Sequence, residues 1–277
     1  MLTLFLLAQM AQMPMPMSAD TAEDPVALAK EFLEADLSSR PGGGSKELSV
    51  LTTGGSGFDR TNGSWTFVES PSVRIKVSTT QQRVVAMDNL AVSPREVAVE
   101  DANGRTRSPE EMRGMVVQVP VEVARDRGVE YANRHIGKET MGGLSISADG
   151  LVSRGSRFVY RFAWRTTLDE DGVAFGMETV SVEIDPTSGE VLRFRNLVSK
   201  VDEDQPIAIE ATRCRRIVES DLGHLEGFKV TQMVLVSLLE EDSTSVPAWA
   251  VGYEFVGPMG RRPGACYVHA MTGKLLK

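Results

Sequence analysis

Hydrophobic and polar residues alternate along three stretches of the chain, and a short polar turn interrupts each stretch. Two of these stretches, residues 73–89 and 180–196, align without a gap at an offset of 107 positions. Four aligned pairs are identical: Val73/Val180, Thr80/Thr187, Val84/Val191 and Asn89/Asn196. The last eleven residues, 267–277, carry the same pattern. Because alternation at period two is typical of half-buried strands, each stretch predicts a strand–turn–strand hairpin.

An amphipathic helix is predicted before each hairpin. The first begins with Asp24 as N-cap and Pro25 at the first helical position, and the glycine-rich stretch 41–45 ends it. The second begins near Pro120 and the third near Pro206, and both place apolar residues at helical spacing before a glycine. Each helix therefore needs a sheet on which to bury its apolar stripe.

Each predicted helix and hairpin is accompanied by one of the three tryptophans, Trp65, Trp164 and Trp249. A tryptophan on the inner face of a sheet buries about 150–250 Å² and can anchor a helix there. Ser108 and Glu111 have the spacing of a capping box, which predicts a further short helix. The pattern as a whole predicts an α+β fold of two to three repeated units, each with one helix packed on a small antiparallel sheet.

Composition narrows the possible functions. The 277 residues are 42% apolar and 25% charged, which is normal for a packed protein and too apolar for disorder. A net charge of −8 and a pI near 5.1 argue against a nucleic-acid footprint, which needs a clustered basic face. No run of 18 apolar residues occurs, so no membrane span is predicted.

The N-terminus allows two interpretations. The apolar run 2–8 and the small residues after it resemble the end of a secretory signal, although no basic region precedes the run. The alternative is a frayed hydrophobic terminus. Four methionines follow at positions 10, 13, 15 and 17, and such soft thioethers can hold Cu(I). The alternative for these methionines is a disordered tail beside the signal, and cleavage of the leader stays open.

The two cysteines, Cys214 and Cys266, are too few for a disulfide framework and lack metal-ligand spacing. Strand and helix periodicity places both at core-facing positions. Buried thiols are the favoured prediction because free cysteine is among the most buried residue types. A disulfide between them is the alternative.

Catalytic chemistry finds little support. The three histidines, His135, His224 and His269, fall in separate predicted units, and no H-E-x-x-H motif or phosphate-binding loop is present. Gly137 is expected to end a helix between His135 and Glu139, so no shared metal is predicted there. We therefore predict no catalytic, cofactor-binding or metal-binding residue, and no enzyme; an enzyme would need a pocket with convergent titratable groups.

The helix, the tryptophan-bearing strand and the closing hairpin together resemble the PepSY-type propeptide domain, a cystatin-like arrangement. The resemblance is carried by residues 182–192 and by residues 267–276 with Pro247–Trp249 upstream. The first unit departs from the pattern because Gln82 stands where the turn glycine is expected. The predicted domains are a signal remnant or methionine-rich leader at 1–19, a diverged unit at 20–100, and further units at 101–200 and 201–277.

This resemblance implies an extracytoplasmic, non-catalytic module, which in some relatives inhibits or chaperones a peptidase. We expect a secreted, periplasmic or cell-envelope protein that binds a peptidase or another envelope protein through a sheet face, a sheet edge or a groove between units. No cofactor and no nucleic-acid partner are expected. The alternative is a structural or ligand-sensing envelope scaffold without a peptidase partner, and the oligomeric state stays open.

Overall fold

The computed structural model describes residues 24–37, 50–154, 156–199, 201, 205–240, 242 and 244–276. The predicted signal remnant with its four methionines and the glycine-rich stretch 41–45 lie outside these residues. Within the described ranges, no helix combines the length and the apolar character that crossing a bilayer requires.

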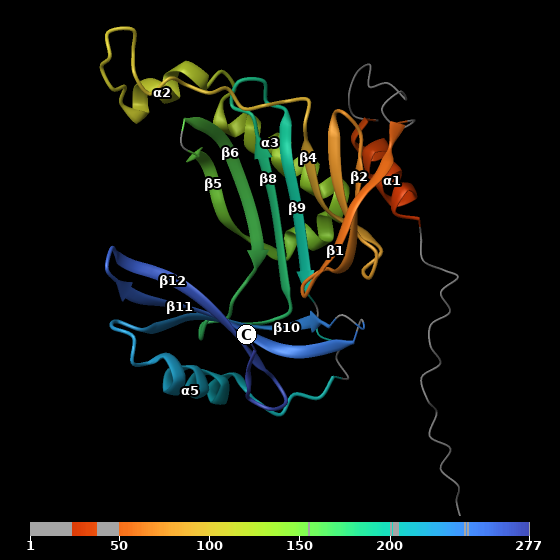
Figure 1. Cartoon of the computed structure of the whole chain (residues 1–277), viewed down its shortest axis with the longest axis vertical. Coiled ribbons are helices and arrows are strands. Elements are labelled where there is room, and N and C mark those ends of the chain that lie inside the picture. The colour runs from red at the N-terminus through yellow and green to blue at the C-terminus, as the bar shows by residue number, and fades with distance from the viewer. Residues whose placement is uncertain are drawn as a thin grey trace, which may run out of the picture.

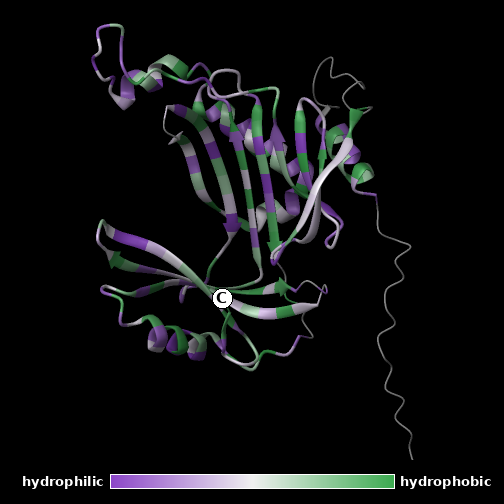
Figure 2. Ribbon diagram, viewed as in Figure 1, coloured by the Kyte–Doolittle hydropathy of each residue, from purple (hydrophilic) through white to green (hydrophobic). Residues whose placement is uncertain are grey.

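The larger of two sheets has eight strands in the order β1-β2-β3-β4-β9-β8-β6-β5, and all neighbours are antiparallel (Figure 1). Hydrophobic and hydrophilic residues alternate along its strands, as the sequence pattern predicts (Figure 2). The strands are β1 (Thr52–Asp59), β2 (Gly63–Glu69), β3 (Val73–Ser78), β4 (Arg83–Asn89), β5 (Leu144–Arg154), β6 (Arg157–Thr166), β8 (Met177–Ile184) and β9 (Val191–Ser199).

The second sheet lies below the strand ends of the first and has the order β13-β12-β11-β10-β7 (Figure 1). Its short strand β7 comes from the connection between β6 and β8 and pairs parallel with β10, so this connection joins the two sheets. The strands are β7 (Val173–Phe175), β10 (Lys229–Leu239), β11 (Ser245–Gly257), β12 (Gly260–His269) and β13 (Leu275–Leu276).

Helices cover one face of each sheet. The first sheet carries α1 and α3, α4 follows directly after α3, and the second sheet carries α5 (Figure 1). The capping box of Ser108 and Glu111 begins α2, as its spacing predicts. The helices are α1 (Pro25–Leu37), α2 (Pro109–Val116), α3 (Val121–Ile136), α4 (Lys138–Gly142) and α5 (Ala211–Leu222).

The predicted fold class is wrong. The protein is mostly β, with two large sheets and five helices in the described residues, instead of repeated units with one helix on a small sheet. Strands from the predicted units 20–100 and 101–200 form one sheet because β4 and β9 pair, with Asp88 binding Arg193 and Arg195 at 2.8 Å across the join. An edge strand presents unpaired backbone groups, and this pairing satisfies them. The domain boundaries themselves stay a prediction.

The offset of 107 positions reappears in the strand register. Met87 of β4 lies opposite Phe194 of β9, which is the residue 107 positions later, and Asp88 lies opposite Arg193. The two hairpins therefore meet about a local two-fold axis between Met87 and Phe194. Their turns also match, because Gln82 (φ 50°) shares the left-handed conformation of Gly189 (φ 75°).

Two of the three tryptophans anchor a helix on a sheet. Trp164 lies in the core beneath α3, and the Trp249 indole N–H donates to the Ile209 carbonyl (2.7 Å) just before α5. Trp65 does not, because the β2–β3 register turns it to the helix-free face, where Lys76 Nζ lies 4.4 Å from its ring. Both cysteine thiols are free, as predicted. Cys214 is buried in the core beneath α5, whereas Cys266 is only partly buried against it.

Candidate functional site

A groove of about 810 Å³ lies where the end of the first sheet meets the edge of the second. We call it the junction groove. Its walls come from α4, β5, β6 and β8 on one side and from β7 and β10 on the other. It is lined by Glu139, Thr140, Gly143, Leu144, Thr166, Phe175, Gly176, Met177, Glu178, Val201, Ile207 and Leu235.

Apolar side chains of the junction groove are exposed to solvent. Phe175 is 73% exposed although its ring centroid lies 6.0 Å from that of the buried Trp249, and Ile207 is 39% exposed. Phe175 is on β7 and Leu144 on β5, and these two strands are edges of their sheets. The groove therefore combines exposed apolar surface with two edge strands. On β7, Asp169 already bonds the backbone N–H and C=O of Val173 (2.8 Å each).

A second cavity, of about 500 Å³, opens at the C-terminal end of α3, between α1 and strands β4 and β9. We call it the polar cleft. Thr140 and Glu178 line both cavities, so the two adjoin. The polar cleft is lined by Leu28, Glu31, Phe32, Ala35, Gln82, Arg83, Val84, Arg134, His135, Ile136, Thr140, Glu178, Phe194, Asn196 and Val198.

His135 forms one wall of the polar cleft. Its imidazole stacks on Phe32 with ring centroids 3.8 Å apart and planes at 19°, and it also contacts Tyr131. Burial, with a smaller contribution from the Arg134 charge, lowers the pKa of His135 to about 4, so the ring is neutral at pH 7. Its buried Nε2 atom has no hydrogen-bond partner in the structure.

Asn196 lies on the sheet side of the cleft. Its side chain is buried, and its Oδ1 has no hydrogen-bond partner in the structure. The aligned residue Asn89 differs, because its Nδ2 donates to the Val191 carbonyl (3.0 Å) and its Oδ1 accepts from the Ala91 N–H (3.1 Å). Buried polar groups are almost always paired. Asn196 Oδ1 is one of several exceptions in the described residues, with Asn62 Oδ1, Trp65 Nε1 and Asp185 Oδ1 outside the cleft.

Arg83 supplies the cleft with a half-buried positive charge. Its Nε donates to Gln81 Oε1 (2.9 Å), and its Nη2 donates to the backbone carbonyl of Asn196 (3.4 Å). Burial lowers the pKa of the Arg83 guanidinium, and the negative charge of Glu178 partly opposes this effect. The guanidinium remains charged because arginine is not deprotonated in proteins.

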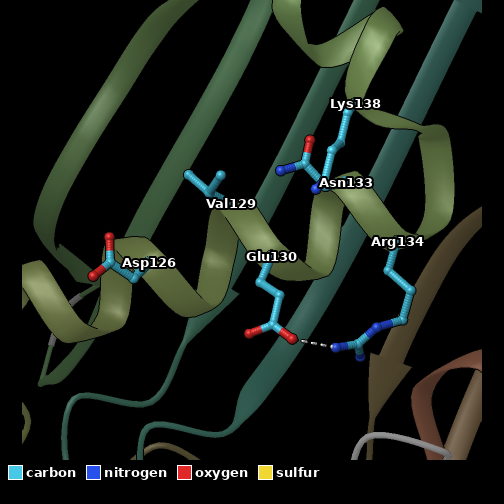
Figure 3. A pocket seen from close by; sticks show the side chains of 6 residues that line it. All are labelled: Asp126, Val129, Glu130, Asn133, Arg134 and Lys138. Carbon is cyan, nitrogen blue, oxygen red and sulfur yellow. Dashed lines mark hydrogen bonds and ion pairs between the residues drawn. The ribbon is translucent and has the colours of Figure 1, made fainter.

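The outer surface of α3 is hollowed but carries no comparable site. Figure 3 shows the side chains there lying on the helix surface, with an ion pair of 2.8 Å between Glu130 and Arg134, one helical turn apart. Arg134 also lies 3.6 Å from Asp36 of α1. These charges are paired along and between helices, which is typical of a solvated helix surface.

The three histidines discussed from the sequence are not brought together. His135 lies in the polar cleft, His224 follows α5 beside the Asp221 carbonyl, and His269 ends β12. In the part of the chain that the structure describes, no three His, Cys, Asp or Glu side chains group as a metal ion would require. Sequence analysis did not single out Arg83 or Glu178. It found Asn196 only as an identity with Asn89. Strand alternation places this polar residue at a core-facing position, and that is the signal that could have pointed to it.

Comparisons with known proteins identify no family for this chain. No family model matches the chain, and no curated protein matches it. Among solved structures, the chain is similar to the Bacillus megaterium YpeB C-terminal domain, with 10% identity, a TM-score of 0.40, and 91% of this chain and 95% of that chain covered. A likeness of this size is too weak to support an inference, so the PepSY-type resemblance stays a prediction.

Proposed function

We propose that the protein is an exported, non-catalytic binding module that takes an extended segment of a peptidase or another envelope protein into the junction groove. The exposed Phe175 on the edge strand β7 is the observation that carries this proposal. The apolar N-terminal run and the PepSY-type resemblance support the export. Mass spectrometry of the mature N-terminus tests export separately.

The apolar surface of the groove supports a protein partner. Phe175, Ile207 and Met177 line one continuous hollow, whose volume is within the range of specific binding sites. Large aromatic side chains that remain exposed are enriched where proteins bind each other, since their burial contributes strongly to affinity. Covering Phe175 would remove most of its exposed ring from water.

The two edge strands support an extended conformation for the bound segment. A strand added to β5 would satisfy backbone N–H and C=O groups on the open side of that strand. Beside β7 such pairing would be short, because Asp169 already bonds both backbone groups of Val173. Ile146 of β5 is 64% exposed at the same edge as Leu144, so an added strand on β5 would also meet an apolar side chain.

The charge of the groove favours one kind of segment. Glu139 and Glu178 are its ionisable lining residues, and both are acidic. An extended segment with apolar side chains and one lysine or arginine fits this lining.

Photocrosslinking tests the proposal. A benzophenone amino acid replaces Phe175 in one variant and Met259, which is 85% exposed at the β11–β12 turn, in the control. In cells that produce the protein, we expect a discrete crosslinked product at position 175, with the crosslinked peptide of the partner extended and containing a basic residue. Equal products at both positions, or none at position 175, would overturn the proposal.

The polar cleft favours a second candidate function, a ligand-sensing scaffold. His135 Nε2 and Asn196 Oδ1, two buried atoms of residues that line the polar cleft, lack a hydrogen-bond partner in the structure. A small polar ligand could supply one. The two cavities share Thr140 and Glu178, so a basic residue in the junction groove and a cationic ligand in the polar cleft would meet at the same carboxylate.

A further inference from the structure

The polar cleft holds a positive and a negative side chain that do not meet. Arg83 and Glu178 both line it, and the charge of Glu178 acts on Arg83. The contacts of these two described residues nevertheless include no ion pair between them. Opposite charges at the surface of a cavity with a gap between them suit a molecule that carries both complementary charges.

Two hydrogen-bonding atoms of the cleft also lack partners. Asn196 Oδ1 can only accept, and Nε2 of the neutral His135 accepts when the proton is on Nδ1. Both atoms are closed off from solvent, so a ligand reaches them only when the two side chains turn toward the cavity. An ammonium group, with three N–H donors and no acceptor, then matches them together with a Glu178 oxygen.

The C-terminal end of α3 also favours a positively charged group in the cleft. The C-terminal residues His135 and Ile136 of the 16-residue α3 line the cavity. The C-terminal end of a helix carries partial negative charge and stabilises a nearby cation. Arg134, which also lines the cleft, opposes this effect, since its positive charge lowers the pKa of His135. Glu130 and Asp36 beside its guanidinium offset part of that charge.

The remaining walls are apolar. Leu28 and Phe32 come from α1, and Phe194 and Val198 come from β9. A volume of about 500 Å³ is ample for a small molecule that has an aliphatic or aromatic side chain.

From these features we propose that the polar cleft binds a free α-amino acid with an apolar side chain. Its ammonium group pairs with Glu178 and its carboxylate with Arg83. The Asn196 and His135 side chains turn toward the ammonium group, so that Asn196 Oδ1 and His135 Nε2 accept from it. Its side chain packs on Phe32 and Phe194. This inference does not depend on a protein partner in the junction groove.

Isothermal titration of the full chain with L-leucine and L-phenylalanine tests the inference. Two analogues of leucine act as matched controls on the unaltered protein: 3-methylbutylamine lacks the carboxylate, and 4-methylpentanoic acid lacks the ammonium group. We expect saturable binding of at least one amino acid and at least about tenfold weaker binding of each analogue, since each loses a charge-assisted contact.

Variants then assign the binding to the cleft. Arg83→Gln and Asn196→Val are expected to weaken binding at least about tenfold, whereas His224→Gln, at an exposed position outside both cavities, leaves it unaltered. No binding at millimolar amino acid, equal binding of the analogues, or unchanged affinity in Arg83→Gln would each overturn the inference. The crosslinking result at Phe175 is independent of all these outcomes.

Discussion

The layer beneath α5 and the layer beneath the end of α3 have the same architecture but differ in how their buried polar groups are paired. In both, a helix lies on an antiparallel sheet, and a hairpin closed by a left-handed glycine, Gly273 or Gly189, stands at the side. Beneath α5 the polar group of the largest side chain is paired, since the Trp249 N–H donates to Ile209. Beneath the end of α3, His135 and Asn196 each keep an unpaired buried atom.

The difference indicates which layer is structural and which can bind. A closed core pairs its polar groups internally, because an unpaired buried group destabilises the fold by about 1–3 kcal/mol. The α5 layer follows this rule and needs nothing further. The polar cleft departs from it while holding Arg83 and Glu178 beside an open cavity, and such departures concentrate at functional sites.

The largest expected effect concerns the closed layer. Trp249→Ala should lower the free energy of unfolding by about 3–5 kcal/mol, because it leaves a cavity beneath α5 and removes the hydrogen bond to Ile209. Denaturant unfolding measures it. Trp65→Ala, on the half-exposed helix-free face, is the control and should cost less than half as much; equal losses would contradict the assignment of Trp249 as the anchor of α5.

The second-largest effect is a pH dependence of stability that arises in the α3 layer, from His135. The folded-state pKa of His135, about 4, is below its unfolded value of 6.5, so the unfolded chain binds the proton more readily. The stabilisation from neutral His135 is complete above pH 6.5 and is lost as the pH falls towards 4, by about 2–3 kcal/mol. Unfolding curves from pH 7 to 4 measure it.

The matched control for this pH dependence is an exposed histidine. His135→Gln should flatten the pH dependence in that window, whereas His224→Gln, outside both cores, should leave it as it was. A steep loss of stability that persists in His135→Gln would show that other groups cause it.

The hairpin turn beside the α3 layer should be sensitive to a single methyl group. Gly189→Ala should cost about 1–2 kcal/mol for the left-handed conformation. It should cost more because the new Cβ would displace Arg127 Nη1, which donates to the Gly189 carbonyl (3.0 Å). Gly104→Ala, with φ 77° but open space around it, isolates the backbone contribution. Equal thermal shifts for the two variants would contradict the crowding at Gly189.

The smallest effect compares the two aligned asparagines. Asn196→Val should leave stability unchanged or raise it by about 1 kcal/mol, because it removes an unpaired buried amide. Asn89→Val should lower stability by about 1–2 kcal/mol, because it removes two hydrogen bonds. Differential scanning calorimetry measures both, and a clear loss in Asn196→Val would show that its amide has a structural partner.

Local patterns predicted the local elements. Alternation placed the hairpins, the capping box placed α2, and the alignment identified Gln82 as the counterpart of a turn glycine, whose left-handed backbone it adopts. The joining of β4 to β9 was not predictable, because periodicity shows which face of a strand is buried but not which edge finds a partner. The three-residue β7 was also too short to give a periodic signal.

The polar cleft could not be predicted from the sequence, because its residues meet only in the folded chain. Arg83, His135 and Glu178 come from three separate elements, and each alone reads as an ordinary surface or core residue. Only Asn196 gave a sequence signal, through its identity with Asn89. Even that signal needed coordinates, since the two side chains differ in their hydrogen bonds and not in their position within the hairpin.

Amide hydrogen exchange on the protein, alone and with the partner that crosslinks through position 175, tests the binding role most directly. The account predicts slower exchange on partner binding in β5 and β7, whose open edges flank the junction groove, and unchanged exchange in the hairpin around Met259. Protection confined to that hairpin, with β5 and β7 exchanging as in the free protein, would contradict it.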